Sequence, residues 1–344
     1  MRFFGFSMCL LMAACTGNKD DPDTECSESS PESCLYATDT SYEVQTHTVS
    51  INDTGRIGGT RQIALNLYEP ATVESDLPTL FLTPGAPLGT GQNPAAISAE
   101  NWAQTMASAG YLVIVVDLRG RSETGKQALC DALEIEEEGC TDFRTETWDA
   151  PKDVTSALNW LRSDQADNQW RTRTENAEVG HVGQEMGAST SLMLAGANRA
   201  FGSSAYDFTD NRIEAVMPIA LVGNNNSSDF LTNGIENVGV PTYLTGGVNG
   251  YQSSNLPIDT PDAFSNLPAG DKYLLHFLDE DASIGTFHLD GTTCGECESF
   301  VSWVKTSSLA FADGILKNDA EAITWLGSEN MNIVAGIQAE WYTR

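Results

Sequence analysis

Basic side chains are scarce in this sequence. Lysine and arginine together number 18 against 48 aspartates and glutamates, which gives a formal net charge of -30. A surface this acidic repels phosphate backbones and anionic lipid headgroups, so we expect no nucleic-acid partner. The acidic stretches Glu134–Glu138 and Asp279–Asp281 are the candidates for cation binding, but neither follows the spacing of an EF-hand. A solvated acidic surface is the simpler interpretation, and we predict neither a metal site nor a cofactor.

A transmembrane span is also missing from the N-terminal region. The apolar stretch Phe3–Ala14 has twelve residues, whereas a membrane-spanning helix needs about 20. With Arg2 before it, the stretch matches the apolar part of a signal peptide. Its end, Met12-Ala13-Ala14-Cys15, resembles the lipobox of bacterial lipoproteins, in which the cysteine is acylated. We therefore predict a lipoprotein signal at residues 1–14 and lipid on Cys15, with a plain secretory signal as the alternative.

The resemblance to a lipoprotein has further implications. Thr16, rather than aspartate, follows the cysteine, which favours sorting to the outer membrane of a Gram-negative cell. The lipid is then the one membrane contact that we expect. Residues 15–42 are acidic and rich in serine, threonine and proline, with few aliphatic side chains. Such a segment cannot bury a core, so it predicts a flexible tether before a folded domain at residues 43–344.

Few cysteines remain beyond the signal, and their number is even. Six follow Cys15 in three local couples, namely Cys26 with Cys34, Cys130 with Cys140, and Cys294 with Cys297. In an exported chain this predicts disulfides, although many connectivities are open and local pairing is only a preference. The Cys-Gly-Glu-Cys motif of the last couple is alternatively redox-active, but it lacks the strand–helix setting of a thioredoxin site.

Hydrophobic patterning predicts an α/β domain. Thr46–Ile51 and Arg61–Tyr68 alternate like half-buried strands, whereas Leu80–Thr83 and Tyr111–Val116 are continuous apolar runs typical of buried parallel strands. Further strands are expected at 178–182, 215–219, 242–245 and 273–278, and helices at 101–109, 151–161 and 300–316. Alternating strands and helices predict a mostly parallel, eight-stranded sheet with helices on both faces and no large lid domain.

Residues 179–188 are the segment that indicates a possible catalytic site. Residues 179–188 read Val-Gly-His-Val-Gly-Gln-Glu-Met-Gly-Ala, a strand, a Gly-x-x-x-Gly turn and a helix rich in small residues. This is the pattern of a nucleophile elbow, in which the tight turn leaves no room for side chains beside the nucleophile. The chain here resembles the α/β-hydrolase superfamily, in particular dienelactone hydrolases, cutinases and bacterial polyester hydrolases, over roughly residues 60 to 327. The resemblance implies an oxyanion hole formed by the N–H groups of Ala86, in Thr83-Pro84-Gly85-Ala86, and of Met186.

The serine, acid and histidine that the resemblance requires are all missing. The nucleophile position falls on Glu185, the acid on Asn249, and the histidine on Ile284, or on Ser283 if the loop aligns one residue differently. Serine-type hydrolysis needs a nucleophile, a base and a group that orients the base. Three replacements at the three functional positions predict a hydrolase fold without working serine chemistry. We therefore favour a protein that binds a small-molecule or protein ligand.

An active enzyme is the runner-up interpretation. Glu185 can imitate the aspartate nucleophile of related enzymes that open epoxides or displace halide, provided that a histidine activates water. The sequence has only four histidines, and three of them lie in or near expected strands. The fourth, His288, follows the last strand and is the candidate base. Two further interpretations are a hydrolase that uses a serine elsewhere in the chain and a structural protein of the cell envelope.

Overall fold

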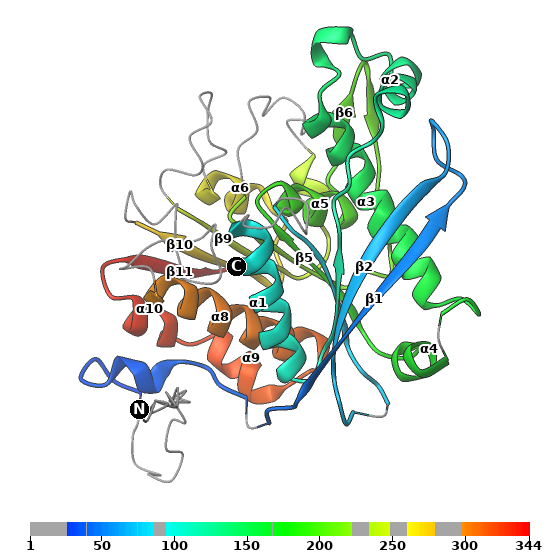
Figure 1. The fold of residues 1–344 in the computed structure, drawn as a ribbon. Coiled ribbons are helices and arrows are strands. Elements are labelled where there is room, and N and C mark those ends of the chain that lie inside the picture. Colours follow the sequence, from blue (N-terminus) through cyan, green and yellow to red (C-terminus); the bar gives the residue numbers. More distant parts are fainter. Residues whose placement is uncertain are drawn as a thin grey trace, which may run out of the picture.

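The computed structural model describes residues 26–38, 40–73, 75–85, 94–166, 168–221, 234–247, 260–278 and 298–344. A nine-stranded sheet runs through this part of the chain (Figure 1). In spatial order its strands are β1 (Val44–Asp53), β2 (Arg61–Pro70), β4 (Leu112–Val116), β3 (Thr79–Thr83), β5 (Val179–Gln184), β8 (Ala215–Ile219), β9 (Thr242–Gly247), β10 (Lys272–Phe277) and β11 (Ala339–Thr343).

The sheet is mostly parallel, as the sequence predicts. Strands β4, β3, β5, β8, β9 and β10 run parallel to one another, while β1, β2 and β11 are antiparallel to the strands beside them. The prediction of eight strands is wrong by one, because β11 adds a ninth strand to β10. Of the five residues of β11 only Ala339 and Trp341 are buried, so its alternating pattern is too short to identify a strand from the sequence. Trp341 stacks on Tyr273 of β10 at 5.7 Å between ring centroids.

Helices cover both faces of the sheet, as expected from the alternating elements (Figure 1). One core contains side chains of α1, α8, α9 and α10, and the other contains side chains of α3, α4, α5 and α6. Strand β4 shows why its sequence is apolar throughout: Val113 and Val115 join the first core, whereas Leu112, Ile114 and Val116 join the second. The helices are α1 (Pro94–Ser108), α3 (Asp142–Leu161), α4 (Asn168–Thr174), α5 (Met186–Leu194), α6 (Thr260–Asn266), α8 (Glu298–Leu316), α9 (Ala320–Leu326) and α10 (Asn330–Ala335), with a 3-10 turn η4 (Ile235–Asn237).

A small lobe beside the sheet has a core of its own and was not predicted. It comprises α2 (Glu123–Ala132), η2 (Glu137–Gly139), the start of α3, and the hairpin β6 (Arg199–Phe201) and β7 (Ser204–Tyr206), drawn at the top of Figure 1. Trp148 lies at its centre and makes edge contacts with Phe201, Tyr206 and Phe208. The disulfide between Cys130 and Cys140 joins α2 to the segment before α3.

The described part of the expected tether, residues 26–38 and 40–42, is packed on the domain. The disulfide between Cys26 and Cys34 closes a short loop around η1 (Pro31–Cys34), and Cys34 is buried. Trp325 of α9 donates its indole N–H to the Cys34 carbonyl at 2.7 Å, and the Tyr36 hydroxyl donates to Asp313 of α8 at 2.9 Å. These contacts hold the N-terminal segment along α8 and α9 (Figure 1).

Two of the three preferred cysteine pairs are therefore present as disulfides. The couple Cys294 and Cys297, like Cys15, lies outside the described residues. Among the residues that the structure describes, no helix combines the length and apolar character needed to cross a bilayer.

Candidate functional site

A single residue connects β5 to α5 at the carboxyl end of the sheet. Strand β5 ends at Gln184 and α5 begins at Met186, so Glu185 makes the whole turn. Its backbone has φ 51° and ψ −111°, a conformation that residues other than glycine rarely adopt. The Glu185 N–H donates to the Ile219 carbonyl of β8 at 3.0 Å, which fixes the turn against the neighbouring strand. Such strained residues cluster at functional sites, so we place the candidate site here.

The two glycines of the turn are required by close backbone contacts. A Cβ atom at Gly183 would lie 1.8 Å from the carbonyl oxygen of Gly187, and a Cβ atom at Gly187 would lie 2.1 Å from the carbonyl oxygen of Thr83. Both oxygens belong to the backbone and cannot move aside. The strand, tight turn and helix predicted from Gly-x-x-x-Gly are present, and β3 lies directly against them.

The side chain of Glu185 turns toward the residue that follows β3. A Cβ atom built on Gly85 would lie 2.7 Å from Oε2, 2.8 Å from Cδ and 2.9 Å from Cβ of Glu185. The carboxyl group therefore rests directly on the Gly85 backbone, in space that any side chain at residue 85 would need. This contact was not predicted, because nothing in the sequence relates residue 85 to residue 185 except the resemblance of the segment around each.

Burial controls the charge of this carboxyl group. It raises the pKa of Glu185 from about 4.5 to about 7. Met186 packs with Leu118 and Ala150 in a small apolar cluster beside the turn, which helps to keep water away. The protonated and ionised forms of Glu185 are therefore both populated near neutral pH.

The three described histidines lie in strands. His181 in β5 is fully buried between the Thr83 hydroxyl, 2.9 Å from Nε2, and the Ser191 hydroxyl, 2.8 Å from Nδ1. Burial lowers its pKa to about 3, so it stays neutral. His276 is buried in β10, and His47 in β1 lies 2.8 Å from the Glu69 carboxylate. The strand positions expected for His181 and His276 are confirmed.

Only part of the predicted site lies in the described chain. Glu185, Met186 and the glycine before Ala86 come together, and Met186 opens α5, whose first N–H groups have no acceptor within the helix. The remaining predicted positions lie outside the described residues, namely Ala86, Asn249, Ser283, Ile284 and His288.

A buried network of ion pairs near the turn was also missed. Asp149 and Asp153 of α3 are buried and paired with Arg56 and Arg61 from the β1–β2 connection and β2, at 2.7 to 3.4 Å. Arg121, from the segment after β4, binds Asp149 at 2.6 Å. The paired residues are 28 to 97 positions apart in the chain, so no local pattern in the sequence indicates the network.

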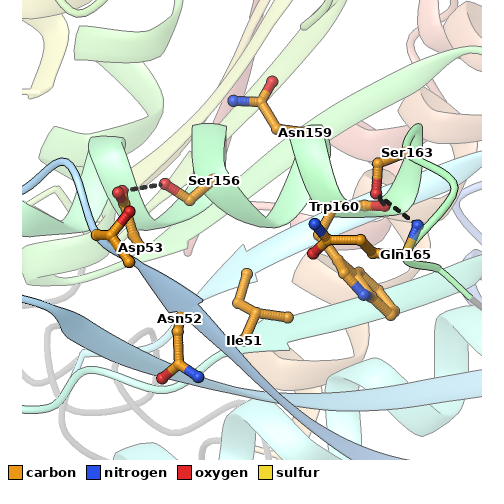
Figure 2. Close-up of a pocket in the computed structure, with 9 residues that line it drawn as sticks. Ile51, Asn52, Asp53, Ser156, Asn159, Trp160, Ser163 and Gln165 are labelled. Atoms are coloured by element: carbon orange, nitrogen blue, oxygen red, sulfur yellow. Dashed lines mark hydrogen bonds between the residues drawn. The ribbon is translucent and has the colours of Figure 1, made fainter.

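A shallow pocket of about 300 Å³ lies elsewhere, between β1 and α3 (Figure 2). Its polar groups bind one another: the Ser156 hydroxyl donates to Asp53 at 2.7 Å, and the Gln165 N–H donates to the Ser163 hydroxyl at 3.1 Å. Although burial opposes the change, hydrogen bonds from Arg56 and Ser156 lower the pKa of Asp53, so this carboxylate is fully ionised. The Asp53 carboxylate of this pocket is committed to Arg56 and Ser156, and none of the lining residues has a strained backbone, so the turn at Glu185 remains the candidate site.

No protein-family model matches the chain, and no curated protein matches it significantly. The functional argument therefore depends on the chain's own residues. The strongest of these is Glu185, which combines strained backbone, partial burial and a raised pKa in one position.

Proposed function

We propose that the protein is an exported lipoprotein with an α/β-hydrolase fold that binds a ligand at Glu185 and has lost serine-type catalysis. The order of the first eight strands of the sheet, β1-β2-β4-β3-β5-β8-β9-β10, supports the fold, because the superfamily shares this order. Glu185 then occupies the nucleophile position, at the sharp turn between a central strand and its helix.

The contact between Glu185 and Gly85 carries the proposal. In acyl transfer, hydrogen-bond donors beside the nucleophile must stabilise an oxyanion. Here the segment that resembles the oxyanion-hole loop is covered by a carboxyl group, 2.7 Å from the position of a Gly85 Cβ. When ionised, this group repels any oxyanion that forms beside it. The arrangement therefore favours binding over hydrolysis of esters.

Restoring the missing groups tests the loss of catalysis. We expect no labelling of the wild type by a fluorophosphonate and no ester hydrolysis by Glu185→Ser, because the new hydroxyl has no base. The triple variant Glu185→Ser, Asn249→Asp, Ile284→His should hydrolyse short activated esters slowly. Labelling of a wild-type serine, or activity in Glu185→Ser alone, contradicts the proposal. An inert triple variant with a native circular dichroism spectrum argues against a hydrolase-like pocket.

A carboxylate nucleophile is the second candidate, favoured by the strained backbone and raised pKa of Glu185. A carboxylate oxygen would displace halide or open an epoxide, forming an alkyl ester that water then hydrolyses, with His288 as the candidate base. Incubation with haloalkanes and epoxides, followed by mass spectrometry of the peptide that contains Glu185, detects the ester. An adduct in the wild type and none in Glu185→Gln would establish this reaction in place of simple binding.

Export and anchoring follow from the N-terminal motif. We expect labelled palmitate to enter the wild type and not Cys15→Ala, and the variant to leave the membrane fraction. Equal labelling of both proteins contradicts acylation of Cys15. A chain that is anchored but binds no small molecule and no partner would instead fit a structural role in the envelope.

A further inference from the structure

Another cavity, of about 240 Å³, lies where the β1–β2 connection, the segment after β4 and the start of α2 meet. The connection lies beside α2 (Figure 1), and a Cβ atom built on Gly58 would lie 2.9 Å from the Gly125 carbonyl oxygen. Three of the ten residues that line this cavity are arginines, Arg61, Arg119 and Arg121, and none of the ten is acidic. In a chain with 18 basic and 48 acidic residues, a lining of this kind indicates a site for an anion.

The buried ion pairs of α3 turn their positive side to this cavity. The side chains of Arg61 and Arg121 are each 7% exposed and bind carboxylates of α3 at 2.6 to 3.4 Å. These carboxylates, of Asp149 and Asp153, do not line the cavity. An anion in the cavity therefore meets the guanidinium groups first. Because electrostatic energy falls with distance, their attraction exceeds the repulsion from the carboxylates behind them.

Arg119 is the arginine that can contact a ligand directly. Its side chain is 53% exposed, and its ion pair with Asp117 uses Nε, at 3.0 Å. A guanidinium group has five N–H donors, and its two terminal nitrogens can bind two oxygens of one phosphate or sulfate group. At the start of α2, the Ser122 hydroxyl accepts the Gly125 N–H at 3.2 Å and keeps its own hydrogen to donate.

The start of α2 adds positive potential to the same wall. Ser122 caps this ten-residue helix, and helix N-termini attract anions because their first N–H groups point out of the helix. Glu123 and Glu146 oppose the attraction from outside the cavity. Glu123 is exposed and pairs with Lys126 at 3.1 Å. Glu146 lies 3.4 Å from a Cβ atom built on Gly120. Neither glutamate lines the cavity, so the arginines remain the charges closest to a ligand.

We propose that this cavity binds a small ligand with a tetrahedral oxyanion, a phosphate or sulfate group, and that Arg119 is its direct partner. The ligand is small because the net charge of -30 repels long polyanions, whereas a single such group fits a volume of about 240 Å³. A tetrahedral group offers oxygens to the guanidinium and to the wall of α2 at once, whereas a guanidinium takes up both oxygens of a carboxylate. The site is separate from the turn at Glu185 and does not depend on the function proposed for that turn.

Calorimetric titration of the purified protein with inorganic phosphate, sulfate and acetate tests the proposal. At an ionic strength of about 0.15 M the screening length is about 8 Å, so distant acidic groups repel the anion little. We expect phosphate and sulfate to bind and acetate to bind more weakly. Arg119→Gln should weaken phosphate binding by about tenfold or more, because charge-assisted hydrogen bonds are lost. Gln62→Glu adds a carboxylate of the same shape to the cavity wall and should also weaken binding.

Arg212→Gln is the matched control. Arg212 likewise binds an aspartate two residues before it, Asp210, at 2.6 Å, and its side chain is 40% exposed. It precedes β8 and does not line the cavity, so its replacement should leave phosphate binding unchanged. Phenylglyoxal, which modifies accessible guanidinium groups, gives a second measurement by peptide mass spectrometry. Phosphate should protect Arg119 from the reagent and leave Arg212 reactive.

Four results would overturn the proposal. Phosphate binding that survives Arg119→Gln contradicts the site, and equal losses in Arg119→Gln and Arg212→Gln show an effect of net charge alone. Acetate that binds as tightly as phosphate contradicts the tetrahedral ligand. A wild-type protein that gives no heat with phosphate or sulfate, and whose Arg119 they do not protect, has no anion site in this cavity.

Discussion

Glu185 links backbone strain to charge at the scale of one residue. The turn that holds Glu185 at φ 51° also places its carboxyl group on Gly85, where it is only partly exposed to water. A serine in this turn would present a small hydroxyl, whereas glutamate extends an acid across the gap to the end of β3. The residue type at this position therefore changes the chemistry of the turn without changing the fold around it.

The raised pKa of Glu185 predicts a pH-dependent stability. The folded state holds the proton more tightly than the unfolded state, so the contribution is fully favourable below about pH 4.5 and is lost as the pH rises through about 7. Glutamine has the same shape and no charge. We expect Glu185→Gln to be more stable than the wild type by about 1 to 3 kcal/mol at pH 8 and equally stable at pH 4.

Urea unfolding at pH 4, 6 and 8 measures this difference. Glu214→Gln is the matched control. Glu214 directly precedes β8, at the end of the strand opposite to the turn, and a hydrogen bond with Glu178 raises its pKa to about 7. In the Glu214→Gln variant, the contribution of Glu185 to the free energy of unfolding should still be lost as the pH rises through about 7. A Glu185→Gln variant with the same pH profile as the wild type would show that the carboxyl group is solvated.

At the scale of elements, buried ion pairs tie α3 to the sheet. Asp153 is fully buried, and although hydrogen bonds from Arg61 favour its ionised form, burial raises its pKa. Arg61 approaches both carboxylate oxygens of Asp153 at 2.8 Å. Arg56 and Arg121 extend the same network to the β1–β2 connection and the segment after β4. Buried ion pairs therefore join α3 to the β1–β2 region and to the segment after β4, and water screens these pairs little.

Replacing Arg61 should therefore lower the free energy of unfolding strongly. Arg61→Met leaves the buried Asp153 with Arg56 as its remaining partner, and we expect a loss of about 3–5 kcal/mol. Arg171→Met is the control, because its partner Asp164 is exposed and such pairs contribute about 0–1 kcal/mol. Chemical unfolding at pH 7 compares the two. Equal losses would mean that the network is worth no more than a surface pair, while partial recovery in Arg61→Met with Asp153→Asn would confirm the buried charge as the cause.

The sequence predicted the elements that have strong periodic patterns. Eight of the nine strands of the large sheet, all but β11, and the helices at 101–109 and 300–316 were found because their apolar residues follow a regular pattern and face a core. Helix α3 was expected to begin near Pro151, but it begins at Asp142, because Thr141 caps it by accepting the Arg144 N–H. Pro151 lies inside the helix, although proline is disfavoured there because it has no N–H to donate and clashes with the preceding turn.

The elements that were missed depend on contacts distant in sequence. The lobe around Trp148 is assembled from α2 and a hairpin about 70 residues later in the chain, so no local window contains its core. The contact between Gly85 and Glu185 likewise joins two residues that are far apart in the sequence. The turn glycines were predicted from a local pattern, although Gly187 is required by the distant Thr83 carbonyl and only Gly183 by an atom within the turn. The direction of the Glu185 side chain has no such local pattern, because it depends on the segment after β3.

At the scale of the whole molecule, charge is the dominant feature. A net charge of -30 means that acidic side chains repel one another across the surface, which destabilises the compact state. The buried pairs of α3 are shielded from salt, so added salt should weaken the repulsion more than it weakens them. The acidic surface therefore predicts a protein that gains stability as ionic strength rises.

We expect the melting temperature at pH 8 to rise by several degrees between 0.01 and 0.5 M NaCl, because the screening length falls from roughly 30 Å to less than 10 Å. Replacing the exposed Glu28, Glu43 and Glu236 by lysine changes the net charge by six, from -30 to -24. This variant should melt at a higher temperature in low salt and respond less to NaCl, as scanning calorimetry can measure. Replacing the same three residues by glutamine changes the charge by three and should give about half the effect. A melting temperature independent of salt in all three proteins would mean that the surface charges are neutralised by bound cations, and the repulsion argument would then be wrong.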